Sequence, residues 1–542
     1  MAVAPTAPAL HRERDAAYER LEELILSRDQ VGSSQAFYDL IKEGRPVGEL
    51  VREVVRIHAP YTHVPFHQRN DNGEIRFVNN DHTLLGMRAG LRLKELVPSE
   101  LAYLPIAQAV WYIPTGLDPW NQLIGKAPGH YNRLGLAVRA LDGNTIAPVA
   151  HWVDGEPILD EKATLEEKLD HWLTLVMRSE VEPAYQYFVG LLNSHPNERE
   201  QILAQLMFVG LIDVQDRTVF RSSYTTGHRA FRARATIEVA ETVGWENAHD
   251  ALYAGVLDLG VGPHWHSMYE MACTYTRVVL QGQDVEMRHT NKTPLSREEV
   301  QKTVEVIRET NEVTVVKHIG ELLKQGKSVI SIMDAILLAA TESIIEAGAP
   351  GAYNMPQHAY EYCNTMRWFM GRFDHKHKAK LLFIAGSFVN ETSQGQKVFP
   401  GNEPRPIKAP RGASSWSPQQ ILQRLDEAIV ELQKDEAIAL THTYLKNGFD
   451  AQPLVSVLAL GASKMGNDPH NQEISQVQLE DFGRNTHAAR GRLLLGAVAH
   501  TTGHRKLGDP LESYRRFTEA FGIKSTQNAK GDGEVEEGLD DD

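Results

Sequence analysis

The sequence contains 23 histidines, and four of them recur at equivalent points along the chain. His82, His228, His358 and His487 each follow a short polar or turn-like run (NND, TTG, MPQ and RNT) and open a stretch of helical periodicity. A helix N-terminus has unpaired N–H groups and a positive dipole end, which favour a neutral imidazole of lowered pKa. Such an imidazole suits metal ligation or general-base catalysis at neutral pH. We therefore predict that the four side chains line a central cavity and bind iron or zinc.

The recurrence also has a structural explanation. A duplicated unit keeps its structural residues as well as its functional ones. A histidine that opens a helix can hydrogen-bond the preceding loop in every copy. The sequence alone leaves both interpretations open.

Two further pairs of histidines have spacings that suit a metal ion. His264 and His266 flank a tryptophan in the segment PHWH, and in extended backbone residues two apart point the same way, so the pair is a candidate for binding one metal ion. On a helix the two rings would point nearly opposite ways. His500 and His504 are four residues apart, but a glycine and two threonines between them weaken the case for a shared helical face.

Three other residues are candidates for catalysis. Tyr61 stands in the histidine- and proline-containing loop RIHAPYTHVPFHQ, which we place at the mouth of a pocket. Arg88 and Arg234 each lie six residues after a repeat histidine (88 − 82 and 234 − 228). Their guanidinium groups would bind an anionic group of a substrate or pair with carboxylates of adjacent helices. The segment DHKHK, with its two histidines among lysines, is predicted to be a solvated face.

The histidines belong to four similar segments, each predicted to form about five helices. The first helix of each is amphipathic, with apolar residues three and four apart. The N-cap residues in three of the copies are Thr164, Ser296 and Ser417. The second helix ends in three copies at a glycine suited to left-handed backbone, namely Gly44, Gly326 and Gly448. The second copy has His195-Pro196 there, so its turn must close differently. The fifth helix is clear only in the first three copies.

We predict an all-α chain of four tandem multi-helix repeats. Because no repeat can bury its apolar faces alone, the repeats should pack as a solenoid or a closed α-toroid. The predicted repeats span residues 1–155, 156–285, 286–405 and 406–523, and residues 524–542 form an acidic tail predicted to be disordered. The proline- and glycine-rich segment 398–416 is the clearest linker. The stretch GEIRFVNN is predicted to be a short extended loop.

Composition narrows the class of protein. With 42% hydrophobic and 23% charged residues, the chain is typical of a soluble globular protein. The net charge of −15 argues against nucleic acid as a partner, since phosphate binding needs a basic surface. The two cysteines exclude a disulfide framework and favour a reducing compartment. The absence of a signal-peptide pattern and of a long apolar run predicts a cytoplasmic protein without a membrane partner.

The function predicted from these features is an enzyme, a metal-dependent oxidoreductase or oxygenase acting on a small organic substrate. Iron would favour oxidation, whereas zinc would favour hydrolysis through a metal-bound water, so a metal-dependent hydrolase is an alternative. A second alternative is a helical-repeat scaffold that binds a peptide or protein without catalysis. Metal-free acid–base or oxygen chemistry on the histidines is a third. No nucleotide-binding, zincin or α/β-hydrolase motif is present.

Overall fold

The all-α prediction is confirmed by a computed structural model of the chain. The model describes residues 15–59, 68–69, 75–76, 82–116, 159–214, 226–260, 264, 266–278, 289–399, 401–402, 404, 406–465, 468–506 and 508–524. The strands among the described residues are two residues long, β1 (Gln68–Arg69) and β2 (Ile75–Arg76), paired antiparallel with Gln68 opposite Arg76. β2 lies within GEIRFVNN, the stretch predicted to be extended.

The helices follow one another in two similar series in the first half of the chain. The first series is α1 (Ala16–Leu26), α2 (Gln30–Lys42), α3 (Val47–His58), α4 (His82–Leu93) and α5 (Leu104–Gly116). The second is α7 (Leu165–Met177), α8 (Val181–Ser194), α9 (Arg199–Ile212), α10 (His228–Val243) and α11 (His249–Val256). α12 (Ser267–Val278) follows them.

Two more series complete the order. The third is α13 (Arg297–Glu309), α14 (Glu312–Lys324), α15 (Val329–Glu346), α16 (Asn354–Arg372) and α17 (Lys378–Gln396). The fourth is α18 (Pro418–Val430), α19 (Lys434–Lys446), α20 (Ala451–Lys464), α21 (His470–Arg484) and α22 (Gly491–Gly503), followed by α23 (Glu512–Ala520). The fourth series thus has the fifth helix that the sequence pattern did not reveal. The packing of four repeats as a solenoid or toroid stays a prediction.

Short 3-10 helices interrupt the connections between these helices. They are η2 (Ser99–Leu101), η4 (Pro196–Glu198), η5 (Trp245–Asn247), η6 (Leu257–Gly260), η8 (Pro350–Tyr353), η9 (Ala413–Ser415) and η10 (Ala488–Arg490). η4 forms the turn after His195, where the second series lacks the glycine of the others, so the different closure predicted there is confirmed. The predicted linker 398–416 contains η9 and, among its described residues, no α-helix.

Local chemistry sets the helix ends. Thr164, Ser296 and Ser417 each form a capping box, in which the cap side chain accepts from the third helical N–H and the glutamate or glutamine at that position accepts from the cap N–H. Each reciprocal pair satisfies two N–H groups that would otherwise lack partners. The three glycines that end the second helices, Gly44, Gly326 and Gly448, have φ of 78°, 80° and 73°. Glycine has no Cβ to oppose this left-handed conformation.

The chain divides into two compact units. Unit 1 comprises Met1–Arg88, Ala109–Trp265 and Gly538–Asp542, and unit 2 comprises Ala89–Gln108 and His266–Glu537. The division cuts α4 and α5, so the segment between their middles belongs to unit 2. The predicted boundaries of four repeats stay a prediction.

Unit 1 packs its second series closely around α10. α10 contacts α3, α9 and α11. Gly210 permits the close approach of α9, because a Cβ there would lie 2.9 Å from the carbonyl oxygen of Arg229 on α10. α10 is buried along nearly its whole length, including its charged residues. Those charges must therefore find partners inside the unit.

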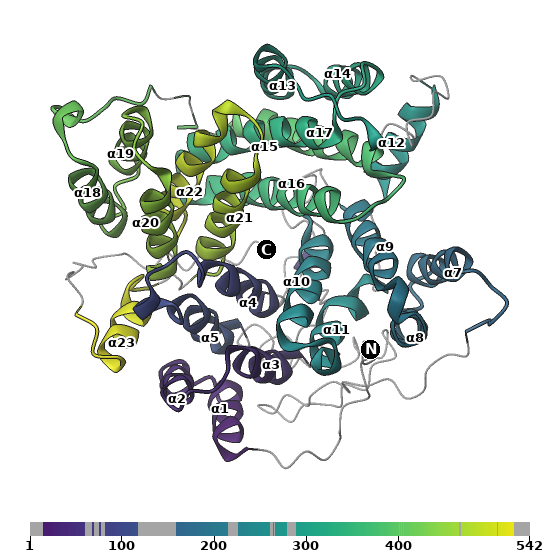
Figure 1. Cartoon of the computed structure of the whole chain (residues 1–542), viewed down its shortest axis with the longest axis horizontal. Coiled ribbons are helices and arrows are strands. Elements are labelled where there is room, and N and C mark those ends of the chain that lie inside the picture. Colours follow the sequence, from purple (N-terminus) through teal and green to yellow (C-terminus); the bar gives the residue numbers. More distant parts are fainter. Residues whose placement is uncertain are drawn as a thin grey trace. The chain divides into compact units, whose positions relative to one another are not determined.

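Unit 2 buries the apolar faces of the third and fourth series. α15, α16 and α17 lie side by side, and α22 packs against α15, α19 and α21 (Figure 1). Leu93 and Val97, from the segment Ala89–Gln108, join a core that includes Leu425, Leu458 and Leu494. Gln108 ties this segment to the fourth series, because its Nε2 donates to the carbonyl oxygen of Ser463 at 2.7 Å.

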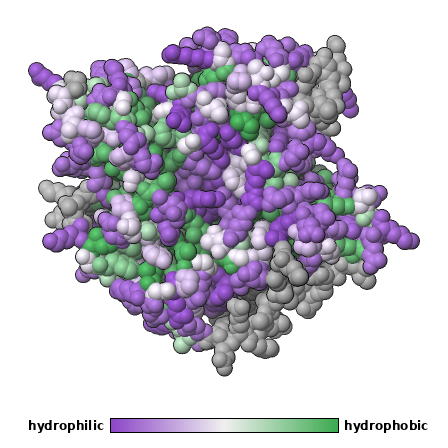
Figure 2. All heavy atoms as spheres, viewed as in Figure 1, coloured by the Kyte–Doolittle hydropathy of each residue, from purple (hydrophilic) through white to green (hydrophobic). Residues whose placement is uncertain are grey.

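The outer helices present polar faces to solvent. α13 buries only Val300, Thr303, Val306 and Ile307, and the visible face over α13 and α14 is mostly hydrophilic (Figure 2). No helix within the described part of the chain combines the length and the apolar character needed to cross a membrane.

Candidate metal centre

α21 and α22 of unit 2 bring together one carboxylate and three histidines. Asp468 stands just before α21, and His470 is the first residue of that helix. His500 lies in the last turn of α22, and His504 is the residue that ends it. The two helices pack against each other (Figure 1). Residues 30 positions apart in sequence therefore meet in one buried cluster.

Asp468 holds the start of α21 and orients His470. Its Oδ1 accepts a hydrogen bond from the backbone N–H of His470 at 3.0 Å and lies 2.9 Å from Nδ1 of the same residue. Its Oδ2 accepts from Nε of Arg505 at 3.3 Å. A carboxylate at a helix start satisfies an N–H group that has no partner within the helix. Asp468 is thus fixed in position without any ion.

Asp468, His470 and His504 offer three ligand atoms that lie within 4.8 Å of one another. The three residues are 1%, 2% and 6% exposed. A metal ion lies about 2.0–2.2 Å from a histidine nitrogen or a carboxylate oxygen that binds it. The distance from the three ligand atoms to the point equidistant from them exceeds this by less than about 1 Å. Small side-chain rotations therefore suffice to surround one ion.

His500 and His504 have buried ring nitrogens that point to a ligand. Nε2 of His500 lies 2.9 Å from Oε1 of Gln357. Because an amide oxygen only accepts hydrogen bonds, Nε2 must be the donor. The neutral ring therefore carries its proton on Nε2 and a lone pair on Nδ1. Among the described residues, Nδ1 of His500 and Nδ1 of His504 have no hydrogen-bond partner. The two rings stack with centroids 4.7 Å apart. A buried nitrogen without a partner costs free energy unless something binds it.

The electrostatic environment keeps these imidazoles neutral and the carboxyl ionised. Burial lowers the pKa of His504 to about 3 and the pKa of His500 well below its usual value. Burial opposes ionisation of Asp468, but the hydrogen bond from His470 and the positive charge of Arg505 hold its pKa well below the usual range. Neutral imidazole and ionised carboxylate are the forms that bind metal ions.

Of the predicted ligands, His82 and His228 meet each other in unit 1. They open α4 and α10, each is 3% exposed, and their ring centroids are 5.5 Å apart at an interplanar angle of 87°. Tyr112 lies edge-on to His82 at 6.2 Å, and Phe231 lies 5.3 Å from His228. The prediction that these two histidines open helices is therefore confirmed, whereas a shared central cavity and metal binding stay predictions.

Arg88 and Arg234 share one buried carboxylate. Nε of Arg88 donates to Oε2 of Glu238 at 2.9 Å, and Nη2 of Arg234 lies 3.4 Å from Oε1 of the same residue. The three residues are 2%, 1% and 5% exposed. This is the pairing considered as the alternative to substrate binding. A role for the two arginines in catalysis stays untested.

The helix positions predicted for the other two repeat histidines were wrong. His358 is the fifth residue of α16, one turn inside the helix, and its Nδ1 lies 2.7 Å from the carbonyl oxygen of Asn354. His487 precedes only the three-residue η10. The helix that follows the variable loop in the fourth series is α21, so the residue equivalent to His82 and His228 is His470. The rings of His358 and His470 lie 5.6 Å apart.

His487 has a structural contact instead. Its Nε2 lies 2.8 Å from the carbonyl oxygen of Ser331 on α15, and its backbone N–H donates to Oδ1 of Asn485. We expect His487→Ala to lower the free energy of unfolding by about 1 kcal/mol, the usual value of one such bond, without changing the metal content. Urea denaturation and elemental analysis check this, with the exposed His171→Ala as control. Loss of metal from the His487 variant, with metal retained by the His171 variant, would show that His487 is a ligand.

His264 and His266 fall in different units. In unit 1, Nδ1 of His264 lies 2.7 Å from Oδ2 of Asp213 and 2.7 Å from Nη1 of Arg229, which also pairs with Asp213. In unit 2, the carbonyl oxygen of His266 accepts from the backbone N–H of Glu270 at the start of α12. Joint metal binding by the two histidines stays a prediction. Tyr61 and the acidic tail after Lys524 lie outside the described residues.

Asp468 and His470 were not among the ligands predicted from the sequence, and His500 and His504 were considered only as a weak pair. A usable signal was present, because Asp468-Pro469-His470 follows the third helix and variable loop of the fourth copy and opens a stretch of helical periodicity. The later histidine of RNTH, His487, also follows a polar run, which favours it as the equivalent position in the sequence. The glycine between His500 and His504 does not matter, since His500 lies within α22 and His504 ends it.

His375, predicted to lie on a solvated face, is instead partly buried. Its ring packs 5.5 Å from Phe369 and 5.4 Å from His377. Burial lowers its pKa to about 3, with further lowering by His377, Lys376, Lys378 and His289. Asp374 pairs with His289 at 3.4 Å, but its side chain is 92% exposed, so its negative charge offsets this lowering of the pKa only a little.

This shift predicts acid sensitivity. The folded pKa lies below the unfolded value of about 6.5, so the unfolded chain binds the extra proton. The contribution of His375 to stability is therefore complete above pH ~6.5 and is lost as pH falls toward 3. We expect His375→Gln to reduce the acid-induced loss of the free energy of unfolding by up to about 1 kcal/mol per pH unit. The value is kept below the full effect of one proton because the ring is not fully buried. Urea denaturation at pH 7 and pH 5 measures it; an unchanged slope relative to wild type would contradict it.

Comparisons of the chain with protein-family models, with curated proteins and with solved structures found no match.

Proposed function

We propose that the chain is a metal-dependent oxidoreductase whose ferrous ion is bound by Asp468, His470 and His504. The observation that carries the proposal is the group of three ligand atoms within 4.8 Å of one another, all on buried residues. Two histidines and one carboxylate, with further positions left for substrate and oxygen, are the ligand set of non-haem iron oxygenases. Such a centre would oxidise a small organic molecule.

The surroundings support a bound cation. The ionised Asp468 supplies one negative charge, and the imidazoles of His500 and His504 are kept neutral by burial. His500 stacks on His504, and Tyr353 packs edge-on against both rings with centroids 5.4 Å and 6.0 Å away. These contacts restrict the rotation of His504. A ligand that is already held in place loses little conformational entropy when the metal binds.

The test is metal analysis of the purified full-length chain, prepared anaerobically with ferrous ion. We expect about one iron per chain for wild type, and loss of iron in His504→Ala and His470→Ala. The matched control is His171→Ala, because His171 is an exposed histidine of α7. The nitric oxide adduct of the wild-type protein should give the electron paramagnetic resonance signal of high-spin non-haem iron.

The other outcomes contradict the proposal in different ways. Zinc that resists replacement by iron, at the same three residues, would favour the metal-dependent hydrolase. Iron content that is equal in the wild type, the two variants and the control would exclude this centre. A folded protein that binds neither metal would favour a helical-repeat scaffold that binds a peptide or protein without catalysis.

A further inference from the structure

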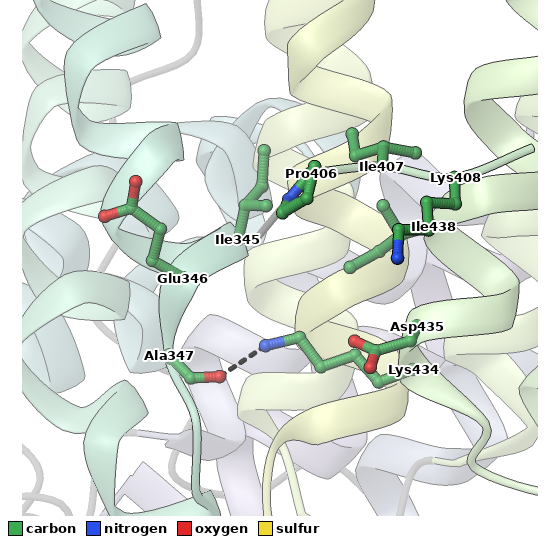
Figure 3. Close-up of a pocket in the computed structure, with 9 residues that line it drawn as sticks. All are labelled: Ile345, Glu346, Ala347, Pro406, Ile407, Lys408, Lys434, Asp435 and Ile438. Atoms are coloured by element: carbon green, nitrogen blue, oxygen red, sulfur yellow. Dashed lines mark hydrogen bonds between the residues drawn. The ribbon is translucent and has the colours of Figure 1, made fainter. Parts of the chain in front are cut away.

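A pocket opens in unit 2 between α15, the linker and α19. It has a volume of about 370 Å³ and is lined by Ile345, Glu346, Ala347, Pro406, Ile407, Lys408, Lys434, Asp435 and Ile438. Figure 3 shows the apolar side chains of Ile345, Ile407 and Ile438 on one side and the ammonium group of Lys434 beside the Ala347 carbonyl. The volume lies within the range of sites for small organic molecules, about 300–1,000 Å³.

The charges around this pocket favour an anionic ligand. Glu346 is paired with Arg308, so its charge is compensated. Burial, moreover, raises the pKa of Glu346. Among the described residues that line the pocket, the two ammonium groups of Lys408 and Lys434 then outnumber the one carboxylate of Asp435. Lys434 donates to the carbonyl oxygen of Ala347, so its ammonium group is directed into the pocket.

One side chain connects the pocket to the histidine cluster. Nζ of Lys434 lies 5.2 Å from the centroid of the Tyr353 ring. That ring contacts His500 and His504, and its hydroxyl donates to the carbonyl oxygen of Ala499 on α22 at 3.0 Å. A Cβ at Gly503 would lie 2.1 Å from the Tyr353 hydroxyl and 3.0 Å from Cδ of Lys434. Tyr353 is thus a single layer between Lys434 and the two histidines.

We infer that this pocket binds a small carboxylate with an apolar body, and that its occupancy affects the metal centre through Tyr353. Lys434, with Lys408, binds the carboxylate, while Ile345, Ile407 and Ile438 contact the apolar part. Tyr353 is a positioning residue that transmits occupancy of the pocket to His504. The role of Tyr353 rests on the proposed function, but the binding of a carboxylate does not.

The experiment titrates the full-length chain, loaded with Co²⁺, with hexanoate and 4-phenylbutyrate by calorimetry. The corresponding neutral amides are the matched probes. We expect the acids to bind about tenfold tighter than the amides, the effect of one charge-assisted hydrogen bond. Lys434→Gln and the exposed Lys408→Gln should weaken binding of the acids, Lys434→Gln by about tenfold. Lys446→Gln, at the far exposed end of α19, should bind as wild type does.

The visible absorption of bound Co²⁺ gives the second readout. Binding of an acid should shift this spectrum, because Tyr353 contacts His504. Equal binding of acids and amides, no binding of any probe, or equal affinity in the Lys434 and Lys446 variants would overturn the inference. Calorimetric binding with an unchanged Co²⁺ spectrum would overturn the role of Tyr353 in transmitting occupancy of the pocket to His504. If Co²⁺ itself does not bind, the proposed function fails, while lysine-dependent binding of acids to the metal-free chain would still support a carboxylate site.

Discussion

Replacing Glu238 by alanine is expected to lower the free energy of unfolding by about 3–5 kcal/mol. The carboxylate is 5% exposed and accepts hydrogen bonds from Arg88 and Arg234, which are themselves 2% and 1% exposed. Removing it takes the shared anion away from two buried guanidinium groups, and breaking a buried ion pair by removing one partner is costly. Urea denaturation followed by circular dichroism measures the change. Glu241→Ala on the same helix, at an exposed position, is the control and should cost less than about 0.5 kcal/mol.

A triple replacement separates the cost of the buried charges from the value of the contact. Arg88→Met, Arg234→Met and Glu238→Leu together remove all three charges at similar volume. Since apolar replacement of a buried ionic group is often neutral or stabilising, we expect the triple variant to be at least about 2 kcal/mol more stable than Glu238→Ala. If the single and triple variants are equally unstable, the buried charges are not the cause. If the triple variant is stable but inactive, the arginines regain a catalytic role.

Replacing Asp468 by asparagine is expected to weaken metal binding at least about 100-fold while preserving the fold. Asparagine keeps an oxygen that can accept from the backbone N–H of His470, but it loses the charge that neutralises a divalent ion. The loss of an outer-shell partner alone typically costs about 10–100-fold, and Asp468 is a direct ligand in the proposal. Competition with a chromogenic chelator measures the affinity.

Asp468→Ala should differ from the asparagine variant in stability as well. It removes the acceptor of the backbone N–H of His470 and the partner of Arg505. Loss of a helix cap costs about 1 kcal/mol, and loss of a charged hydrogen bond costs about 1.5–3 kcal/mol before screening of the partly exposed Arg505. We therefore expect Asp468→Ala to be about 2 kcal/mol less stable than wild type without metal. Wild-type metal affinity in the asparagine variant would remove Asp468 from the proposed centre.

The local signals in the sequence predicted the helices well. The serine and threonine caps, the left-handed glycines and the three- and four-residue spacing each act within one or two turns, so their consequences need no distant partner. The same holds for the extended stretch that contains β2 and for the turn at His195. His82 and His228 were placed correctly at helix starts for this reason.

The candidate site depended on contacts that local signals do not encode. Its ligands come from the start of α21 and the end of α22, and its neighbours Tyr353 and Gln357 come from η8 and α16. Which histidine of the fourth copy stands where His82 stands in the first depends on where the loop ends and α21 begins. Two histidines compete for that position in the sequence, and periodicity alone does not choose between His470 and His487.

The sequence by itself determined that the chain is all-α, where its capped helices begin, where three of its second helices end at a glycine, and that histidine would be the residue type of interest. The tertiary structure decided which histidines share a cluster, which arginines are paired with a carboxylate, and that Ala89–Gln108 belongs to unit 2. The physical reason is that capping and periodicity act over a few residues, whereas burial and ligand geometry depend on side chains that packing brings together from distant helices.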